Sequence, residues 1–349
     1  MPPETSSSGK PAFTLLPQTG GGWKGFALRL GLFLTAAAAF LVYMMAMPGK
    51  TFSGPLAPLS PEEFQTAANL RADTMYLSDA IGERNLDRYK NLNSAAKYIE
   101  DSLKSLGYSP QSEPFTVQGM AVKNIVVEIP GGQLANEIVL VGAHYDSVNA
   151  CPGADDNATG VAGLLEIARE LRGHVPSRTI RLVAWVNEEP PYFQTPGMGS
   201  WVNAKSTHQR KDRIVAAISL ETIGLYTDAP DSQHYPAGFS LFFPSTGNFV
   251  GFVGNLSSRQ LVRDSVGYFR ATTQFPSAGI AAPAGMTGVG WSDHWSYWQE
   301  GYPAIMITDT ALFRNPNYHK ISDTPEKLSY APMARVVIGI GKLVKYLGK

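Results

Sequence analysis

His144 and Asp146 stand at the end of the apolar run IVLVGA, where their side chains could act together. Side chains alternate along a strand, so both can point to the same side while the tyrosine between them points away. A histidine held by a carboxylate is the arrangement that a metal ligand and its orienting partner require. A histidine that is simply hydrogen-bonded at a strand end fits the same pattern, so the pair alone does not establish a metal site.

Further carboxylates follow other apolar runs. Asp155 and Asp156 lie in the polar loop GADDNATG, Glu188 and Glu189 follow TIRLVAWV, and Glu221 ends IVAAISL. Two adjacent carboxylates repel each other without a cation, although a solvated loop or a helix N-terminus also accommodates them. Each segment taken singly is equally explained as an acidic turn or a capped strand end.

A second histidine, His319, follows Tyr318 in a polar loop late in the chain. Histidine and carboxylate ligands without a thiolate suit zinc, with manganese and cobalt as competitors. Two histidines and three carboxylates are enough for two metal ions that share one carboxylate. Paired metals polarise a carbonyl group and generate hydroxide near neutral pH, so the set taken together predicts a hydrolase.

The elements that must position these residues alternate between strand and helix. Apolar runs predict strands over residues 124–129, 138–143, 179–186, 214–220 and 304–307, and helical spacing predicts helices over 92–106, 160–171 and 331–347. Near-continuous apolar strands separated by helices predict an α/β fold with a largely parallel central sheet and helices on both faces. Ligands bind at the carboxyl ends of the strands in such sheets, which is where the motifs lie.

The first 50 residues differ from the rest in charge and hydropathy. Although 29 basic residues balance 29 acidic ones over 349 residues, the first 50 carry a net +3 and the remainder −3. The uncharged stretch Leu30 to Met47 is about 27 Å long as a helix, enough to span a bilayer. Lys24 and Arg29 precede it, so the N-terminus is predicted in the cytoplasm and the bulk of the chain in the periplasm or outside the cell. A cleaved signal peptide is the alternative, although no small-residue cleavage site follows.

These observations predict a disordered cytoplasmic tail over residues 1–25, a transmembrane signal anchor over 26–48, a linker over 49–60 and one catalytic domain over 61–349. Ser60, Pro61 and Glu63 form a helix-start signature at the beginning of that domain. The balanced charge argues against nucleic-acid binding. A single cysteine, Cys151, excludes an intrachain disulfide and a cysteine-rich zinc module. The sequence carries no signal for an oligomeric state.

The order of the motifs HYD, GADDNATG, NEE, LET and YH resembles that of the zinc peptidases of family M28, which include secreted bacterial aminopeptidases and glutamate carboxypeptidase II. The likeness covers roughly Leu92 to Tyr346. It implies a mixed sheet of the zinc aminopeptidase type and a site with two zinc ions. The zinc ligands implied by the resemblance are His144, Asp155, Glu189, Glu221 and His319.

The resemblance also implies individual roles. Asp155 is expected to bridge the two ions and to be joined to Asp156 through a cis peptide bond. Asp146 is expected to orient the first histidine. Glu188 matches the general base that takes a proton from the attacking water and delivers it to the leaving amine. Tyr318 matches a tyrosine that donates a hydrogen bond to the developing oxyanion.

Three features qualify this assignment. Glu221 stands where many members have aspartate, which leaves the occupancy of that metal position open. Pro190 and Pro191 replace a glycine-rich turn and are expected to reshape the substrate pocket. Asp293 and His294 resemble another family segment near the pocket and are expected to position the substrate, although a hydrogen-bonded loop is an equal alternative.

The resulting hypothesis is a membrane-anchored zinc aminopeptidase that hydrolyses N-terminal peptide bonds and contacts the lipid bilayer through its N-terminal helix. The alternatives are a glutaminyl-peptide cyclotransferase or a carboxypeptidase on the same fold, and a non-catalytic binding module. The intact Asp155-Asp156-Asn157 segment favours hydrolysis over cyclisation. A ligating side chain at every proposed position disfavours a non-catalytic module. The segment Asp228–Trp291 is expected to form the pocket wall, but it has no periodicity that fixes its shape.

Overall fold

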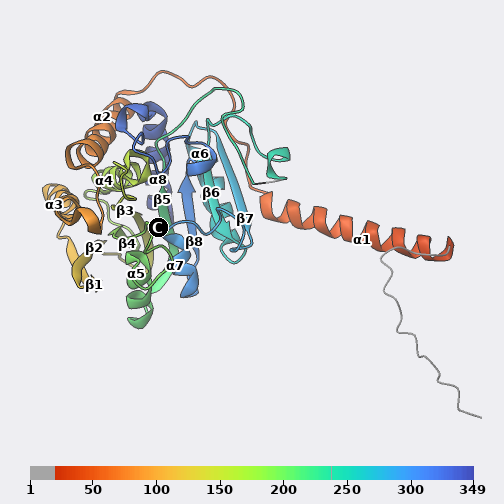
Figure 1. The fold of residues 1–349 in the computed structure, drawn as a ribbon, viewed down its shortest axis with the longest axis horizontal. Coiled ribbons are helices and arrows are strands. Elements are labelled where there is room, and N and C mark those ends of the chain that lie inside the picture. Colours follow the sequence, from red (N-terminus) through yellow and green to blue (C-terminus); the bar gives the residue numbers. More distant parts are fainter. Residues whose placement is uncertain (1–19, 237) are drawn as a thin grey trace, which may run out of the picture. The chain divides into compact units, whose positions relative to one another are not determined.

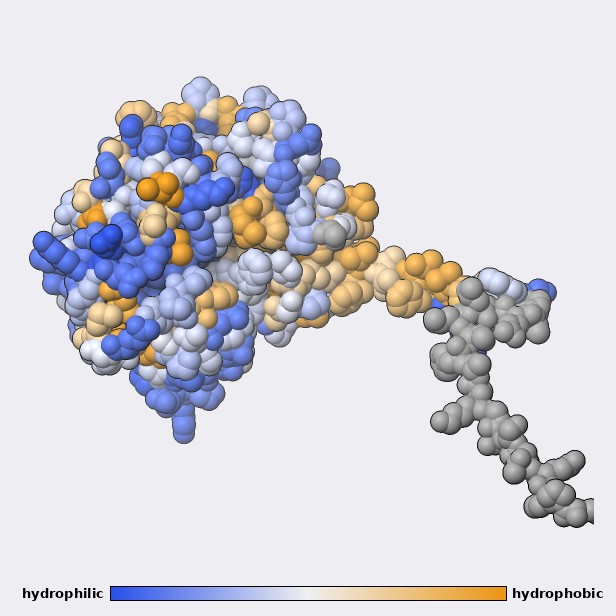
Figure 2. All heavy atoms as spheres, viewed as in Figure 1, coloured by the Kyte–Doolittle hydropathy of each residue, from blue (hydrophilic) through white to orange (hydrophobic). Residues whose placement is uncertain are grey.

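The computed structural model describes residues 20–236 and 238–349 and divides into two compact units, residues 1–46 and 47–349. The described part of the first unit is helix α1 (Gly20–Met45). Its segment Trp23–Met45 is long and apolar enough to cross a membrane. The apolar side chains along this helix are visible in Figure 2. Residues 1–19 of the tail predicted over residues 1–25 lie outside the described residues, and α1 begins at Gly20.

The second unit is built on a mixed eight-stranded sheet with the order β1-β2-β4-β3-β5-β8-β6-β7 (Figure 1). Strands β4, β3, β5 and β8 are parallel neighbours, β1 and β2 form an antiparallel extension at one edge, and β6 runs antiparallel to β8 and parallel to β7. The prediction of a mixed, largely parallel sheet is therefore confirmed. The strands are β1 (Gln111–Val117), β2 (Met120–Ile129), β3 (Leu134–His144), β4 (Arg178–Trp185), β5 (Arg213–Glu221), β6 (Val250–Asn255), β7 (Ser277–Ala282) and β8 (Ala304–Thr308).

Helices cover both faces of this sheet, as predicted. Alternate residues of β3 divide between two cores: Val139 and Val141 pack with the helices of one face, and Ile138 and Leu140 pack with α5 and α7 on the other. This division is the period-two alternation of a strand buried on both sides. The helices of the unit are α2 (Pro61–Met75), α3 (Tyr89–Ser105), α4 (Gly160–Glu170), α5 (Gly199–Gln209), α6 (Arg259–Thr272), α7 (His294–Gln299) and α8 (Tyr330–Leu347).

Helix α2 begins as its sequence predicts. The Ser60 hydroxyl accepts the N–H of Glu63 at 3.1 Å, and the Glu63 carboxylate accepts the N–H of Ser60 at 2.7 Å. This reciprocal pair satisfies two N–H groups that have no partner within the helix.

The segment predicted as a linker is bound to the second unit along α6 and β7. The Arg270 guanidinium donates to the carbonyls of Pro48 and Gly49 at 3.0 Å each, and the backbone N–H of Ser277 donates to the Thr51 hydroxyl at 2.8 Å. The chain is thus fixed to the unit well before α2 begins.

Candidate active site

The carboxyl ends of β4, β3 and β5 bring the predicted site residues together at one edge of the sheet. His144 is the last residue of β3 and Glu221 the last of β5, and these strands pair in parallel. Glu188 and Glu189 follow β4 after Asn187, whose φ of 59° turns the chain sharply. Parallel neighbours end at the same edge, so three separate segments converge there.

Asp156 lies between the two histidines of this site. Its Oδ1 is 3.2 Å from Nε2 of His144, and its Oδ2 is 3.1 Å from Nε2 of His319. The side chains of His144 and Asp156 are buried, and that of His319 is 30% exposed. One carboxylate thus faces both imidazoles through different oxygens.

Two more carboxylates complete two groups of possible metal ligands. Nε2 of His144 lies 3.4 Å from Oε2 of Glu221, and Nε2 of His319 lies 3.1 Å from Oε2 of Glu189. The groups are His144, Asp156 and Glu221, and Asp156, Glu189 and His319, and within each group the ligand atoms lie within 4.8 Å of one another. Asp156 belongs to both.

The donor atoms of these groups fit divalent cations. Both ring nitrogens of His144, Oδ1 of Asp156, Oε1 of Glu189 and Nε2 of His319 are buried without a hydrogen-bond partner among the described residues. Burial and, next, the nearby Asp156 carboxylate raise the pKa of Glu189 to about 8. Buried polar atoms and buried like charges are costly unless a partner compensates them. A cation at each group would supply that partner, and histidine with carboxylate oxygen is a set that zinc accepts.

Asp155 is not in either group, which corrects the expectation that it bridges the metals. Its Oδ1 accepts the N–H of Gly224 at 3.1 Å, and its Oδ2 accepts the side-chain amide of Asn315 at 2.7 Å. Both oxygens are therefore used within the protein, and the side chain of Asp156 takes the shared position. The cis peptide bond likewise joins Asp156 to Asn157 rather than Asp155 to Asp156.

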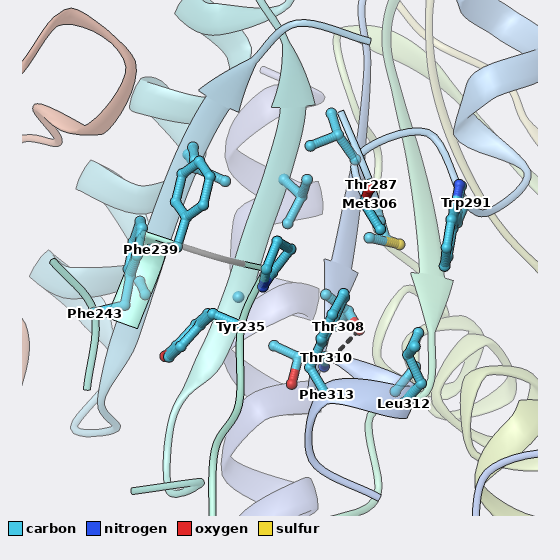
Figure 3. A pocket seen from close by; sticks show the side chains of 18 of the residues that line it. Tyr235, Phe239, Phe243, Thr287, Trp291, Met306, Thr308, Thr310, Leu312 and Phe313 are labelled. Atoms are coloured by element: carbon cyan, nitrogen blue, oxygen red, sulfur yellow. Dashed lines mark hydrogen bonds between the residues drawn. The ribbon is translucent and has the colours of Figure 1, made fainter. Parts of the chain in front are cut away.

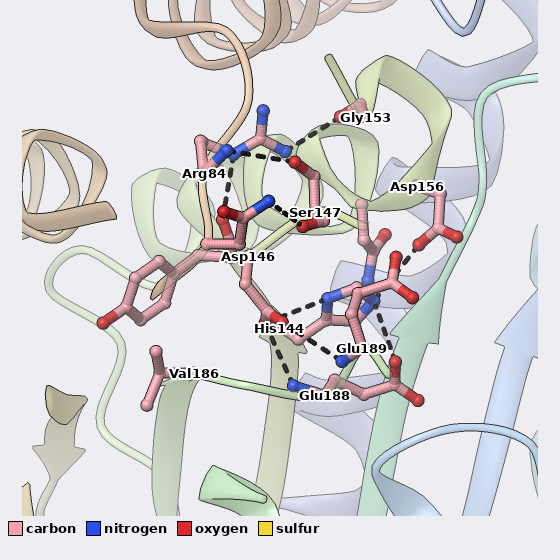
Figure 4. A network of polar contacts seen from close by, with 12 residues as sticks. Arg84, His144, Asp146, Ser147, Gly153, Asp156, Val186, Glu188 and Glu189 are labelled. Carbon is pink, nitrogen blue, oxygen red and sulfur yellow. Dashed lines mark hydrogen bonds and ion pairs between the residues drawn. The ribbon is translucent and has the colours of Figure 1, made fainter. Parts of the chain in front are cut away.

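Asp146 connects the first histidine to the glutamate pair (Figure 4). Its Oδ1 is 3.4 Å from Nδ1 of His144 and accepts the N–H of Glu188 at 3.1 Å. Its Oδ2 accepts the N–H of Glu189 at 3.1 Å. The predicted partner of His144 therefore also holds the backbone of the next ligand loop, which the spacing of the motif does not indicate.

Asp323 holds the other acidic loop in the same way. Its two carboxylate oxygens accept the backbone N–H groups of Asp155 and Asp156 at 3.0 and 3.1 Å. Asp323 was not among the predicted site residues, although its place four residues after His319 in a polar loop was a usable signal.

Arg84 was also missed, and it fixes the chain between His144 and Asp156. The buried guanidinium donates to the carbonyls of Tyr145 at 2.9 Å, Pro152 at 2.5 Å and Gly153 at 2.9 Å (Figure 4). It also donates to the carbonyls of Leu77 and Gly82, both at 3.0 Å. Burial lowers its pKa to about 10, which still leaves it cationic beside an acidic site.

Glu188 and Tyr318 border the two ligand groups without belonging to either. Oε2 of Glu188 is 3.9 Å from Nε2 of His144, and burial raises the pKa of Glu188 well above its usual value. The Tyr318 ring stacks on His319 with centroids 3.9 Å apart. Burial and the carboxylates around it raise the pKa of Tyr318, so its hydroxyl stays protonated and can donate.

An apolar pocket adjoins the site through Glu221 and Tyr318 and has a volume of about 130 Å³. Tyr235, Phe239 and Phe243 form one side of it, and Trp291 and Leu312 stand on the other (Figure 3). The segment 228–291, which includes β6 and β7, therefore contributes much of its wall, together with β8 and the residues that follow it.

The remaining predicted residues lie apart from this pocket. Asp293 and His294 are buried and do not line it, and Nε2 of His294 is 2.8 Å from the carbonyl oxygen of Val289. Both carboxylate oxygens of Asp293 are buried without a hydrogen-bond partner among the described residues, and the expectation that the two residues position the substrate stays a prediction. Pro190 and Pro191, joined by a cis bond, do not line the pocket either.

The family of peptidases designated M28 has a sequence model that matches residues 124–344. The chain belongs to peptidase family M28. The family resemblance inferred from the motifs is thus confirmed, and with it the assignment of the chain to the peptidases. The uncharacterized protein YfbL of Escherichia coli is 37% identical to this M28 chain over 314 residues, which cover 87% of this chain and 96% of YfbL.

Solved structures share the fold of this M28 protein at low sequence identity. The zinc aminopeptidase BSAP of Bacillus subtilis superposes with a TM-score of 0.63 and 15% identity, over 79% of this chain and 94% of BSAP. The glutaminyl cyclase of Tannerella forsythia superposes with a TM-score of 0.57 and 20% identity, over 81% of this chain and 99% of the cyclase. The same fold therefore accompanies both a peptidase and a cyclase.

Proposed function

We propose that this M28 protein is an aminopeptidase that uses two zinc ions to hydrolyse the N-terminal peptide bond of its substrates. The observation that carries the proposal is the pair of three-ligand groups that share Asp156. His144, Asp156 and Glu221 would hold one ion, and Asp156, Glu189 and His319 the other. Bound zinc would supply Lewis-acid polarisation of the scissile carbonyl and activation of the attacking water.

The protein's own groups would manage the proton and the charge. Glu188 is buried, has a raised pKa and lies outside both ligand groups, so its carboxylate is free to take a proton from water and return it to the leaving amine. The protonated Tyr318 hydroxyl would donate to the developing oxyanion. Asp146 would keep Glu188 in place through the backbone N–H.

The pocket supports an aminopeptidase over a carboxypeptidase. Recognition of a terminal carboxylate requires a cation, preferably arginine. None of the described residues that line the pocket is arginine, lysine or histidine, and most are aromatic or aliphatic. We infer that the pocket takes an apolar side chain of the first residue.

We also propose that α1 anchors the protein in a membrane by a single pass, with the N-terminus in the cytoplasm and residues 61–349 as a catalytic domain in the periplasm or outside the cell. The length and apolar composition of Trp23–Met45 support this, as do Lys24 and Arg29 near the N-terminal end of that segment. Two experiments would test this. The protein should stay in the membrane after carbonate washing, and protease added outside intact right-side-out inner-membrane vesicles should digest the domain. A soluble protein that begins after Met45 would show a cleaved signal peptide instead.

The enzymatic proposal is tested with a panel of aminoacyl amides and peptides, assayed by mass spectrometry with and without added zinc. We expect release of the first residue from peptides with a free amino terminus and none from the same peptides after N-acetylation. A peptide that begins with glutamine separates the activities, because a cyclotransferase would yield pyroglutamyl peptide without cleavage. Release of C-terminal residues would instead support a carboxypeptidase.

A further inference from the structure

A row of four residues crosses the sheet from the site to its edge. Glu221 on β5 pairs with Thr308 on β8, Thr308 pairs with Gly251 on β6, and Gly251 pairs with Ala278 on β7. Directly paired residues point to the same face of a sheet, and all four line the pocket. With strands about 4.8 Å apart, Gly251 lies about 10 Å and Ala278 about 14 Å from Glu221 along the row.

The row beyond Glu221 is lined by small side chains, and larger ones flank it. On one side Met306, Val253 and Ile280 pair across the same three strands. On the other side stand Phe249 and Thr310, which also line the pocket. Small residues between two rows of larger ones leave a trough in the surface of the sheet, and Gly251 is its lowest point because it has no side chain.

The aromatic residues Tyr235, Phe239 and Phe243 stand over this part of the sheet and border the same pocket (Figure 3). An apolar group lying in the trough would therefore be covered by rings as well as by strands. The methyl group of an alanine would not extend from the site to Gly251, whereas a phenyl or indole ring extends much further.

We propose that Gly251 determines specificity by admitting a large aromatic or long apolar side chain of the first substrate residue into this trough, with Ala278 marking its far end. This inference rests on the proposed aminopeptidase function. It concerns which amino termini are preferred rather than whether hydrolysis occurs.

Gly251 can be changed without disturbing the fold. A Cβ atom added there would lie 3.4 and 3.5 Å from atoms of Thr308 and 3.8 Å from Cγ2 of Thr310, which are ordinary contacts, and its φ is not in the left-handed region. Gly251→Ala is thus accommodated, and the two methyl groups of Gly251→Val would occupy the trough. Gly132 is the control position, because an added Cβ there would lie 3.6 Å from the Pro176 carbonyl, which is also an ordinary contact. It is far from Gly251 in the sequence and does not line the pocket.

The experiment compares kcat/KM for phenylalanine amide and alanine amide in the wild-type enzyme and in Gly251→Ala, Gly251→Val and Gly132→Val. We expect the Phe-to-Ala ratio to fall modestly in Gly251→Ala and at least about tenfold in Gly251→Val, the scale on which apolar pockets discriminate. The ratio should not change in Gly132→Val. An unchanged ratio in folded Gly251→Val would overturn the inference while leaving the aminopeptidase function intact.

The affinities of 3-phenylpropylamine and propylamine, measured by calorimetry, test the trough without turnover. The wild-type protein should prefer the phenyl compound at least about tenfold, and Gly251→Val should lose that preference. If no amide is hydrolysed but this preference is found, the proposed reaction fails and the trough stands. Equal binding of the two amines by the wild-type protein would overturn the trough.

Discussion

Asp146 accepts the backbone N–H of Glu188 at 3.1 Å. The carboxylate that faces His144 therefore also sets the position of the candidate general base. The two residues lie on neighbouring strand ends of the sheet, and the hydrogen bond joins backbone to side chain. A change of the Glu188 side chain therefore need not disturb the loop that carries it.

For this reason we predict that Glu188→Gln folds and binds metal as the wild type does, yet loses activity by about 10²–10⁴-fold. The amide cannot accept the proton of the attacking water. Zinc content by atomic absorption and kcat on alanine amide are the two measurements. Wild-type turnover in the variant would remove Glu188 from the proton transfer.

Asp156→Asn and Asp155→Asn form a matched pair of adjacent substitutions. Asp156→Asn should lose most bound zinc because the shared carboxylate contributes to both ligand groups. Asp155→Asn should keep its zinc and lose about 1–3 kcal/mol of stability, since an NH2 group would replace one of the two oxygens that accept from Gly224 and Asn315. Metal titration and urea unfolding of both variants check this, and the reverse pattern would restore Asp155 as the shared ligand.

Removal of metal should lower both activity and thermal stability. Ions that bind only the folded state raise the free energy of unfolding in proportion to the logarithm of their concentration over Kd. After dialysis against a chelator we expect a lower Tm and no turnover, with both recovered on addition of two equivalents of zinc. Saturation at one equivalent would contradict the pair of sites.

Arg84→Gln should weaken both the fold and metal binding. Five carbonyl groups would lose donors, at a cost of at least about 3 kcal/mol, and the loop leading to Asp156 would loosen. Zinc affinity should fall about 10–100-fold in the protein that remains folded. Arg88→Gln is the control, because the Arg88 side chain is 63% exposed and its ion pair with Glu83 lies at the surface. Equal zinc affinity in the two variants would limit Arg84 to a structural role.

Glu170 lies away from the site and should make the stability of the protein depend on pH. Burial raises the pKa of Glu170 to about 7, against the attraction of Lys345 at 3.3 Å. A raised pKa favours the protonated folded state, so this contribution is complete below about pH 4.5 and is lost as the pH rises through 7. Glu170→Gln should therefore match the wild type at pH 4.5 and exceed its stability by about 1–3 kcal/mol at pH 8. The exposed Glu326→Gln serves as control in thermal melts, and a variant less stable at pH 8 would refute the assignment.

The long apolar strands and three of the helices were predicted from the sequence, whereas β1, β6, β7, α5, α6 and α7 were not. The apolar run 138–143 lies within β3, and the run 214–220 within β5. Strands β6 and β7 escaped notice because VGFVGN and SAGIAA are short and rich in glycine and alanine. Such residues have little propensity for strands, and their pairing with β8 and with each other decides their conformation.

The site was predictable as a set of segments but not in every residue. Asp155 and Asp156 are chemically identical neighbours, and only long-range contacts with Gly224 and Asn315 determine which one turns away from the histidines. Arg84 precedes the loop it fixes by more than 60 residues along the chain, so no local pattern connects them. His144, Glu189 and Glu221 were readable because they stand at or just after the end of a strand, whereas Asp156 and His319 lie in loops further along the chain.

The contacts of Asp323 have a consequence for the time at which the site can form. His319 and Asp323 follow β8 in the chain, yet His319 belongs to one candidate ligand group and Asp323 accepts the N–H groups of Asp155 and Asp156. A nascent chain can pair β3, β4 and β5 earlier, since all three precede residue 222. The two candidate ligand groups therefore cannot both be complete before the segment that carries His319 and Asp323 is in place.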